Sequence, residues 1–193
     1  MNKDVFIVGV DEAGCAPLAG PVVAAAVILD PKKPIRGVTD SKQLTPEKRE
    51  ALFAIIKRDA IAVGVGMASP EEIDSLNILQ ANMLAMKRAV AALGVEPYLV
   101  QIDGRSKPDL PYPIQTIIDG DVHIPAISAA SIIAKVTRDA IMVEYDKQYP
   151  QYGFAQHKGY PTKVHVEALK NHGACEIHRR SFKPVQLVLE VTT

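Results

Sequence analysis

Hydrophobic positions along this 193-residue chain follow two patterns. Short apolar runs rich in β-branched residues are typical of buried strands. Five such runs occur: one from Val5 that stops at Asp11, and others over residues 21–29, 60–68, 98–102 and 114–118. Longer segments repeat apolar residues every three or four positions, which predicts amphipathic helices.

The predicted helices begin at typical capping residues. Thr45 and Pro46 start a helix that runs to about residue 58, and Ser69 is the N-cap of another. The remaining helices are predicted over the repeat from Leu79 to Leu93, from Ser128 onward, and from Thr162 to about His172. On the helix from Ser128, Arg138 falls off the apolar stripe.

Alternating strands and helices place the chain in the α/β class. Little sequence separates the first three strands, which favours a mixed sheet containing an antiparallel meander. From Pro150 the composition becomes polar, aromatic and rich in Gly and Pro. We therefore expect an α/β domain over residues 1–150, with residues 151–193 as a helical, basic segment packed on the same domain.

Composition narrows the class of protein and the compartment. Hydrophobic residues make up 48% of the chain, which is typical of a globular protein. The 22 Lys and Arg balance 22 Asp and Glu, so net charge does not indicate a nucleic-acid partner. Two cysteines, no signal peptide and no membrane-length apolar run predict a cytoplasmic protein with no membrane partner.

One segment is nevertheless basic. Residues 157–183 carry six Lys and Arg against two Glu, together with four of the five histidines. Such a segment can bind a polyanion, although a solvated helical face is the commoner explanation. The spacing of the histidines is unlike that of a zinc site, and we expect them on the surface or facing phosphate.

Acidic residues stand where the first apolar run stops. Asp11 and Glu12 are adjacent, so each raises the cost of ionising the other. A divalent cation would remove that cost, and oxygen ligands suit Mg²⁺ or Mn²⁺. The alternative is an exposed strand end with two solvated acids.

Two later segments repeat this arrangement. Asp103 ends the fourth apolar run, and Asp119 and Asp121 follow the fifth and compete for the same role. Acids at the same end of neighbouring strands would converge. Four convergent carboxylates favour two-metal phosphoryl transfer, although a single Asp after a strand is more often a turn residue.

An ordered set of motifs over about residues 5–185 resembles bacterial ribonuclease HII. The first motifs are Gly9-Val10-Asp11-Glu12-Ala13-Gly14, Thr39-Asp40-Ser41-Lys42, Ile102-Asp103-Gly104 and Gly120-Asp121. The later ones are Ser128-Ala129-Ala130-Ser131-Ile132-Ile133-Ala134-Lys135-Val136-Thr137-Arg138-Asp139 and His157-Lys158-Gly159-Tyr160-Pro161-Thr162. The resemblance implies a ribonuclease H-like catalytic domain over residues 1–150.

The resemblance also implies an activity. It indicates an endonuclease that cuts RNA–DNA hybrids and single ribonucleotides in duplex DNA, on the 5′ side, leaving 3′-hydroxyl and 5′-phosphate ends. Separately, we expect a monomer. Mn²⁺ or Mg²⁺ would be required. The family's metal-binding catalytic acids match Asp11, Glu12, Asp103 and Asp121, and its substrate contacts match Lys42, Tyr160 and the tripeptide Gly14-Cys15-Ala16.

That tripeptide departs from the family pattern, which is Gly-Arg-Gly. In relatives it reads the ribose 2′-hydroxyl largely through backbone groups. Here Cys15 removes a guanidinium, and Ala16 adds a Cβ that disfavours positive φ. We expect weakened but not abolished cleavage, with the backbone donors retained if φ at Ala16 is negative.

Two other functions compete with the nuclease. One is a catalytically impaired protein that only binds RNA–DNA hybrids, and the other is an exonuclease that acts from free ends. A redox or soft-metal role for Cys15 is a further alternative to an inert side chain, and it would require an unusual thiol pKa.

Overall fold

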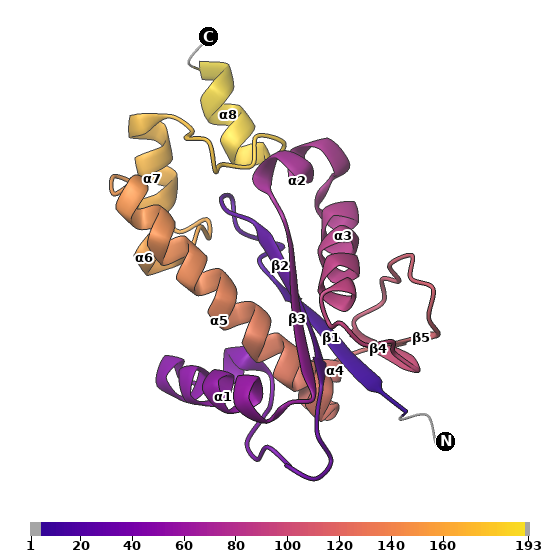
Figure 1. Cartoon of the computed structure of the whole chain (residues 1–193). Helices are drawn as coiled ribbons and strands as arrows, with labels where there is room; N and C mark the ends of the chain where they lie inside the picture. The colour runs from indigo at the N-terminus through magenta and orange to yellow at the C-terminus, as the bar shows by residue number, and fades with distance from the viewer. Residues whose placement is uncertain (1–4, 192–193) are drawn as a thin grey trace.

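A five-stranded mixed sheet forms the centre of the molecule in the computed structural model, which describes residues 5–191 (Figure 1). The sheet order is β3-β2-β1-β4-β5. The bounds are β1 Ile7–Ala13, β2 Val22–Ile28, β3 Ala62–Ala68, β4 Leu99–Asp103 and β5 Ile114–Ile117. β1, β2 and β3 form the predicted antiparallel meander, whereas β4 and β5 run parallel to β1.

Helices cover both faces of the sheet. They are α1 Pro46–Asp59, α2 Pro70–Leu76, α3 Ile78–Ala91, α4 Gly120–His123, α5 Pro125–Gln148, α6 Phe154–His157, α7 Lys163–His172 and α8 Lys183–Val191, with a 3₁₀ turn η1 at Ser41–Gln43. In the part of the chain that the structure describes, no helix is both long and apolar enough to span a membrane.

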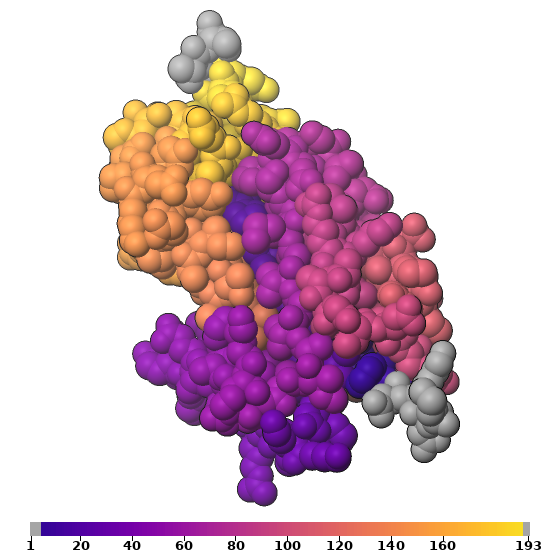
Figure 2. All heavy atoms as spheres, viewed as in Figure 1, coloured from indigo at the N-terminus to yellow at the C-terminus, as the bar shows by residue number. Residues whose placement is uncertain are grey.

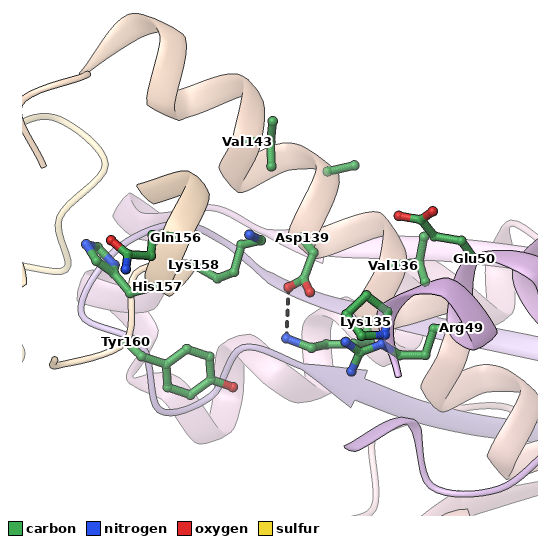
Figure 3. A pocket seen from close by; sticks show the side chains of 12 residues that line it. Arg49, Glu50, Lys135, Val136, Asp139, Val143, Gln156, His157, Lys158 and Tyr160 are labelled. Carbon is green, nitrogen blue, oxygen red and sulfur yellow. Dashed lines mark hydrogen bonds and ion pairs between the residues drawn. The ribbon is translucent and has the colours of Figure 1, made fainter. Parts of the chain in front are cut away.

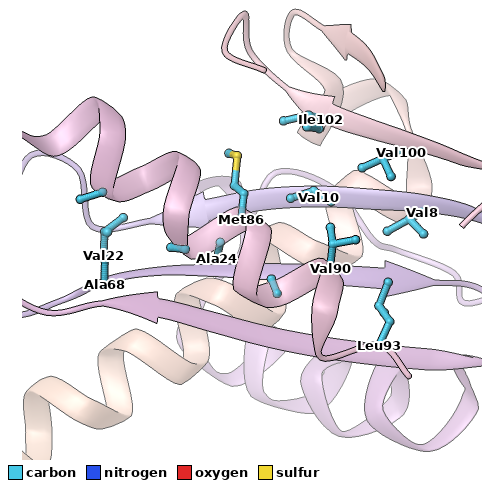
Figure 4. Packing of buried hydrophobic residues seen from close by; sticks show 14 of the residues in the cluster. Val8, Val10, Val22, Ala24, Ala68, Met86, Val90, Leu93, Val100 and Ile102 are labelled. Atoms are coloured by element: carbon cyan, nitrogen blue, oxygen red, sulfur yellow. The ribbon is translucent and has the colours of Figure 1, made fainter. Parts of the chain in front are cut away.

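The alternation of side chains along β2 explains why this strand is apolar throughout. Ala24 packs in the core on the α3 side, where Figure 4 shows Val10 and Met86 beside it. Ala25 and Val27 point to the opposite face and pack against residues of α1 and α5. Because both faces are covered, a continuous apolar run is stable in this strand.

The close approach of α5 to β1 depends on one glycine. A Cβ at Gly9 would lie 2.1 Å from the backbone carbon of Ala126 and 2.3 Å from the backbone nitrogen of Ile127. Only a residue without a side chain lets the first turn of α5 lie directly on the strand. Gly9 is two residues before Asp11, so this contact sets the distance between α5 and the sheet close to that acid.

Two helix predictions are wrong in detail. α5 begins at Pro125 rather than at Ser128, whose hydroxyl instead donates to the carbonyl of Asp121 at 2.7 Å. Leu79 is 51% exposed, because the buried face of α3 is formed mainly by small residues such as Ala81 and Ala85. The helix starts predicted at Thr45 and Ser69 are confirmed, and Thr162 is the N-cap of α7.

The segment after Pro150 contacts both α5 and α2. Tyr152 and Phe154 form a buried cluster with Met142 of α5. Figure 2 shows this segment in orange and yellow against the magenta region of α2. There the Asp74 carboxylate accepts hydrogen bonds from the backbone N–H groups of Arg180, at 2.9 Å, and Ser181, at 2.8 Å.

Candidate active site

Three chain segments bring four acids together, which we call the acid cluster: Asp11, Glu12, Asp103 and Asp121. Val10 of β1 pairs with Ile102 of β4, so Asp103 follows directly beside Asp11. The Asp103 carboxylate accepts a hydrogen bond from the backbone N–H of Gly120 at 2.8 Å, which holds the start of α4 against β4. Asp121 follows in α4 and is 8% exposed.

Asp119, the other candidate at this position, lies elsewhere. It is exposed, has a left-handed conformation with φ 54°, and its side chain caps no helix N–H. The turn at Asp119 therefore directs the next acid, Asp121, toward the sheet. The apolar pattern alone left these two acids undecided, and only the motif resemblance favoured Asp121.

Burial, followed by repulsion between the carboxylates, raises the pKa values within the acid cluster. Burial, together with the charges of Glu12 and Asp103, raises the pKa of Asp11 well above its ordinary value. Burial and the charge of Asp103 also raise the pKa values of Glu12 and Asp121. The surrounding protein groups therefore do not balance the negative charge of these carboxylates. A bound cation would balance it.

The charge of Lys42 interacts with the acid cluster and lowers the pKa values of Glu12 and Asp121. The charges of Asp40, Asp11, Asp121 and Asp103 outweigh desolvation and raise the pKa of Lys42. Its position follows from the turn η1, where the Asp40 carboxylate accepts a hydrogen bond from the Lys42 backbone N–H at 2.9 Å. The buried hydroxyl of Ser131 in α5 donates to the Ser41 hydroxyl at 2.9 Å and fixes this turn on the helix.

The donor set fits a hard divalent cation. All four groups are carboxylates, and the neighbouring Asn82 contributes a buried amide oxygen that has no hydrogen-bond partner among the described residues. As the side chains stand, no three His, Cys, Asp or Glu groups within residues 5–191 are arranged to hold one ion. Closing on a cation therefore requires rotation of carboxylate side chains.

The residues 14–16, which we call the tripeptide loop, adjoin the acid cluster. The Cys15 thiol lies 3.6 Å from a carboxylate oxygen of Glu12. Burial and the Glu12 charge raise the pKa of Cys15 to about 12, so the thiol stays protonated at neutral pH. This opposes the redox and soft-metal interpretations of Cys15.

Ala16 adopts an ordinary backbone conformation. Among the described non-glycine residues, only Asn77, Asp119 and Lys158 have positive φ. A glycine-only conformation is therefore not required at position 16, and the conformational strain considered from the sequence is absent. Gly14 does have φ +101°, so the glycine that the chain retains is the one that the backbone needs.

Tyr160 lies at one end of a groove between α1, α5 and α6 (Figure 3). None of the four acids of the acid cluster lines this groove. The groove has a volume of about 530 Å³ and includes Arg49, Lys135 and Lys158. Tyr160 is 37% exposed, and the Lys135 ammonium lies 5.8 Å from its ring centroid. Lys135 also forms an ion pair with Asp139 at 2.9 Å.

The histidine prediction is wrong. His165 and His178 are 0% and 1% exposed, and their Nε2 atoms lie 3.1 Å apart in a hydrogen bond. His157 is also buried and stacks on His165 with ring centroids 4.4 Å apart. Only His172 of these four is exposed. Spacing could not reveal this cluster, because three separate segments contribute to it.

Sequence reasoning also missed two buried arginines. Arg138 was placed off the apolar stripe of α5 and Arg179 within a basic segment, yet they are 1% and 0% exposed. The guanidinium of Arg179 bonds to a backbone carbonyl of the tripeptide loop, and that of Arg138 bonds to the nearby carbonyl of Ala19. Periodicity gives no signal for such residues, because it assumes that charge faces water.

The fold and the acid cluster define an α/β protein of the ribonuclease H-like class. Ribonuclease H2 of Pyrococcus horikoshii is 29% identical and superposes with a TM-score of 0.82 over 97% of this chain and 98% of that one. The ribonuclease HII of Archaeoglobus fulgidus, solved in complex with PCNA, is 26% identical with a TM-score of 0.77, over 93% and 96% of the two chains. Both structures cover nearly the whole molecule.

The family model described as Ribonuclease HII matches residues 8–185. Ribonuclease HII of Vibrio vulnificus is 60% identical over 185 residues, which are 96% of this chain and 89% of that protein. That of Vibrio campbellii is 58% identical over 186 residues, 96% and 88% of the two chains. The chain belongs to the ribonuclease HII family, and it is a metal-dependent endoribonuclease with ribonuclease H activity on RNA–DNA hybrids.

Proposed function

We propose that this chain cleaves the RNA strand of hybrids and also single ribonucleotides embedded in duplex DNA. Cleavage falls on the 5′ side of the ribonucleotide and leaves 3′-hydroxyl and 5′-phosphate ends. The acid cluster carries the proposal, because burial and mutual repulsion raise the pKa values of its members and favour binding of divalent cations. When bound, two such ions, Mn²⁺ or Mg²⁺, supply an activated water and neutralise the leaving oxygen.

The chain's own residues have distinct roles in this proposal. Asp11, Glu12, Asp103 and Asp121 hold the cations. Lys42 contacts a phosphate of the cut strand, and the tripeptide loop of Gly14, Cys15 and Ala16 contacts the ribose. Tyr160 packs against the sugar-base unit beside the cut, which is worth on the order of 1–3 kcal/mol for a stacked ring. The basic groove beside Tyr160 suits a phosphate backbone.

The alternative of a catalytically impaired hybrid-binding protein has less support. It rested on Ala16, which needs no strained conformation, and on the loss of the Arg side chain at position 15. The acids are all present, and the Cys15 thiol is a neutral donor to Glu12. We also propose a cytoplasmic monomer in which residues 151–193 belong to the same domain as residues 1–150.

The decisive experiment uses a duplex closed by hairpins at both ends that contains one ribonucleotide. With Mn²⁺ or Mg²⁺, the wild-type protein should nick it on the 5′ side of the ribonucleotide. Asp103→Asn should lower the rate by about a thousandfold, since it removes a carboxylate from the proposed metal site. Asp119→Asn is the matched control and should leave the rate unchanged, because Asp119 is exposed.

Other results separate the competing functions. Binding without nicking favours the impaired hybrid-binding protein, and cutting only of open-ended duplexes favours an exonuclease. A nick on the 3′ side of the ribonucleotide would contradict the proposed polarity.

A further inference from the structure

Arg138 and Arg179, which we call the arginine pair, are the largest fully buried side chains of the described residues. Neither forms an ion pair with a carboxylate within residues 5–191. Burial of a guanidinium without a carboxylate partner is costly unless its N–H groups find other acceptors. All six hydrogen bonds from the pair go to backbone carbonyls.

Arg179 bonds to the tripeptide loop itself. Its guanidinium donates to the carbonyls of Gly14, at 2.6 Å, and Cys15, at 3.0 Å, while its Nε donates to the carbonyl of Gly20 at 2.9 Å. Burial and the neighbouring Arg138 lower the pKa of Arg179 to about 9, so the group remains charged at neutral pH. These are therefore charge-assisted hydrogen bonds.

The direction of these carbonyls decides the direction of the next N–H groups. In a planar trans peptide, the C=O and the following N–H point in opposite directions. With the carbonyls of Gly14 and Cys15 turned inward to Arg179, the N–H groups of Cys15 and Ala16 point away from it. Ala16 is exposed, and neither N–H donates to a protein acceptor in the described part of the chain.

Arg138 connects the same loop region to the Tyr160 segment. It donates to the carbonyls of Ala19 and Lys158, each at 3.0 Å. The backbone N–H of Leu18 donates to the carbonyl of Gly159 at 2.8 Å. The loop and the segment that carries Tyr160 are thereby held in one arrangement.

We propose that Arg179 is a positioning residue for ribonucleotide recognition, which fixes the peptide planes so that the N–H groups of Cys15 and Ala16 are available to the ribose 2′-hydroxyl oxygen. The loop lies beside the Glu12 carboxylate. A neutral hydroxyl group binds next to this negative charge more readily than an anionic group does. This inference rests on the proposed function, because it assigns the source of ribonucleotide selectivity at that site.

Binding measured in EDTA tests this inference without cleavage. Fluorescence anisotropy gives the Kd of a duplex with one ribonucleotide and that of the matched all-DNA duplex. Lysine has a single ammonium and cannot reach three separated carbonyls, so Arg179→Lys should lower the ratio of the two Kd values about tenfold. The neighbouring Arg180→Lys is the matched control and should keep the wild-type ratio, because Arg180 is exposed.

A second measurement uses the wild-type protein alone. In ¹⁵N-labelled protein, the amide signals of Cys15 and Ala16 should shift with the ribonucleotide duplex and not with the all-DNA duplex. If Arg179→Lys does not fold, as judged by its thermal melt, this measurement decides.

Three results would overturn the inference: an unchanged Kd ratio in folded Arg179→Lys, an equal loss of affinity for both duplexes, or amides that respond equally to both. A wild-type protein that neither cuts nor prefers the ribonucleotide duplex would instead refute the proposed function. Failure of the two proposals is therefore distinguishable.

Discussion

Asp11 shows how a single carboxyl can oppose folding and still be needed at a site. Its pKa is raised above the ordinary value of 3.8 by burial and by the charges of Glu12 and Asp103. The native state therefore binds a proton more tightly than the unfolded chain does. Above the ordinary pKa, the unfolded chain has lost this proton while the native state still binds it. The free energy of unfolding must therefore fall as the pH rises.

We expect the free energy of unfolding in EDTA to fall as the pH rises above the ordinary carboxyl pKa, with a smaller fall in Asp11→Asn. At pH 7 the variant should be more stable than the wild type, because the amide carries no charge into the buried site. Urea unfolding at several pH values measures this. Asp109→Asn is the control, since the side chain of Asp109 is fully exposed. An equal pH slope in wild type and Asp11→Asn would contradict the repulsion argument.

Single residues of the site were predictable to different degrees. Asp11 and Asp103 were found because each acid follows an apolar run, and that pattern is local. The apolar pattern could not separate Asp121 from Asp119, because their placement depends on a left-handed turn, and only the motif resemblance indicated Asp121. Arg179 could not be found at all, because its partners are carbonyls more than 150 residues earlier in the chain.

At the scale of elements, the contact of α5 with β1 holds the site together. α5 carries Ser131, which positions the turn before α1, and Ser128, which bonds to α4. Its first turn lies against Gly9, only two residues from Asp11. The spacing between this helix and the sheet is therefore transmitted directly to the acid cluster.

Gly9→Ala should destabilise the protein by about 3 kcal/mol or more and reduce cleavage, because backbone atoms of α5 must move to admit the Cβ. Gly37→Ala is the control. Gly37 has φ +82° with open space around it, so only conformational strain of about 1 kcal/mol applies. Thermal melts and cleavage rates of both variants check this, and equal losses would show that steric contact at Gly9 is unimportant.

Element prediction succeeded where the signals are local. The strands and the N-caps depend on neighbouring residues, and their positions are confirmed within a few residues. The start of α5 was misplaced because Pro125 at the first helical position carried the signal, not Ser128. Burial of Arg138 was missed because α5 is covered on more than one side, by the sheet and by the segment after Pro150.

At the scale of the whole molecule, charge is balanced, with 22 basic and 22 acidic residues. Long-range attraction of a polyanion is therefore weak, and binding must depend on a few local cations. The exposed or groove-lining candidates are Lys42, Arg49, Lys135 and Lys158. Arg138 and Arg179 are buried and bonded to carbonyls, so they are not phosphate ligands.

The salt dependence of binding should reflect this small number. With four phosphate contacts, the slope of log K against log salt concentration should be about −3.6, since each contact contributes about −0.9. Lys135→Gln should reduce the magnitude of the slope by about one contact, whereas Lys57→Gln, on the exposed side of α1, should not. Titrations of an RNA–DNA hybrid in EDTA measure it. A slope near −8 would mean that other basic residues take part.

The 24 residues of α5 correspond to a length of about 36 Å. This one helix reaches from the acids at the sheet to the aromatic cluster after Pro150, so it joins both halves of the substrate surface. A backbone break in the exposed turn at residues 31–36 would leave that connection whole, and the two pieces should reassemble into an active nuclease. A break inside α5 would separate the tyrosine from the carboxylates, which makes the turn after β2 the natural place for a split-protein reporter.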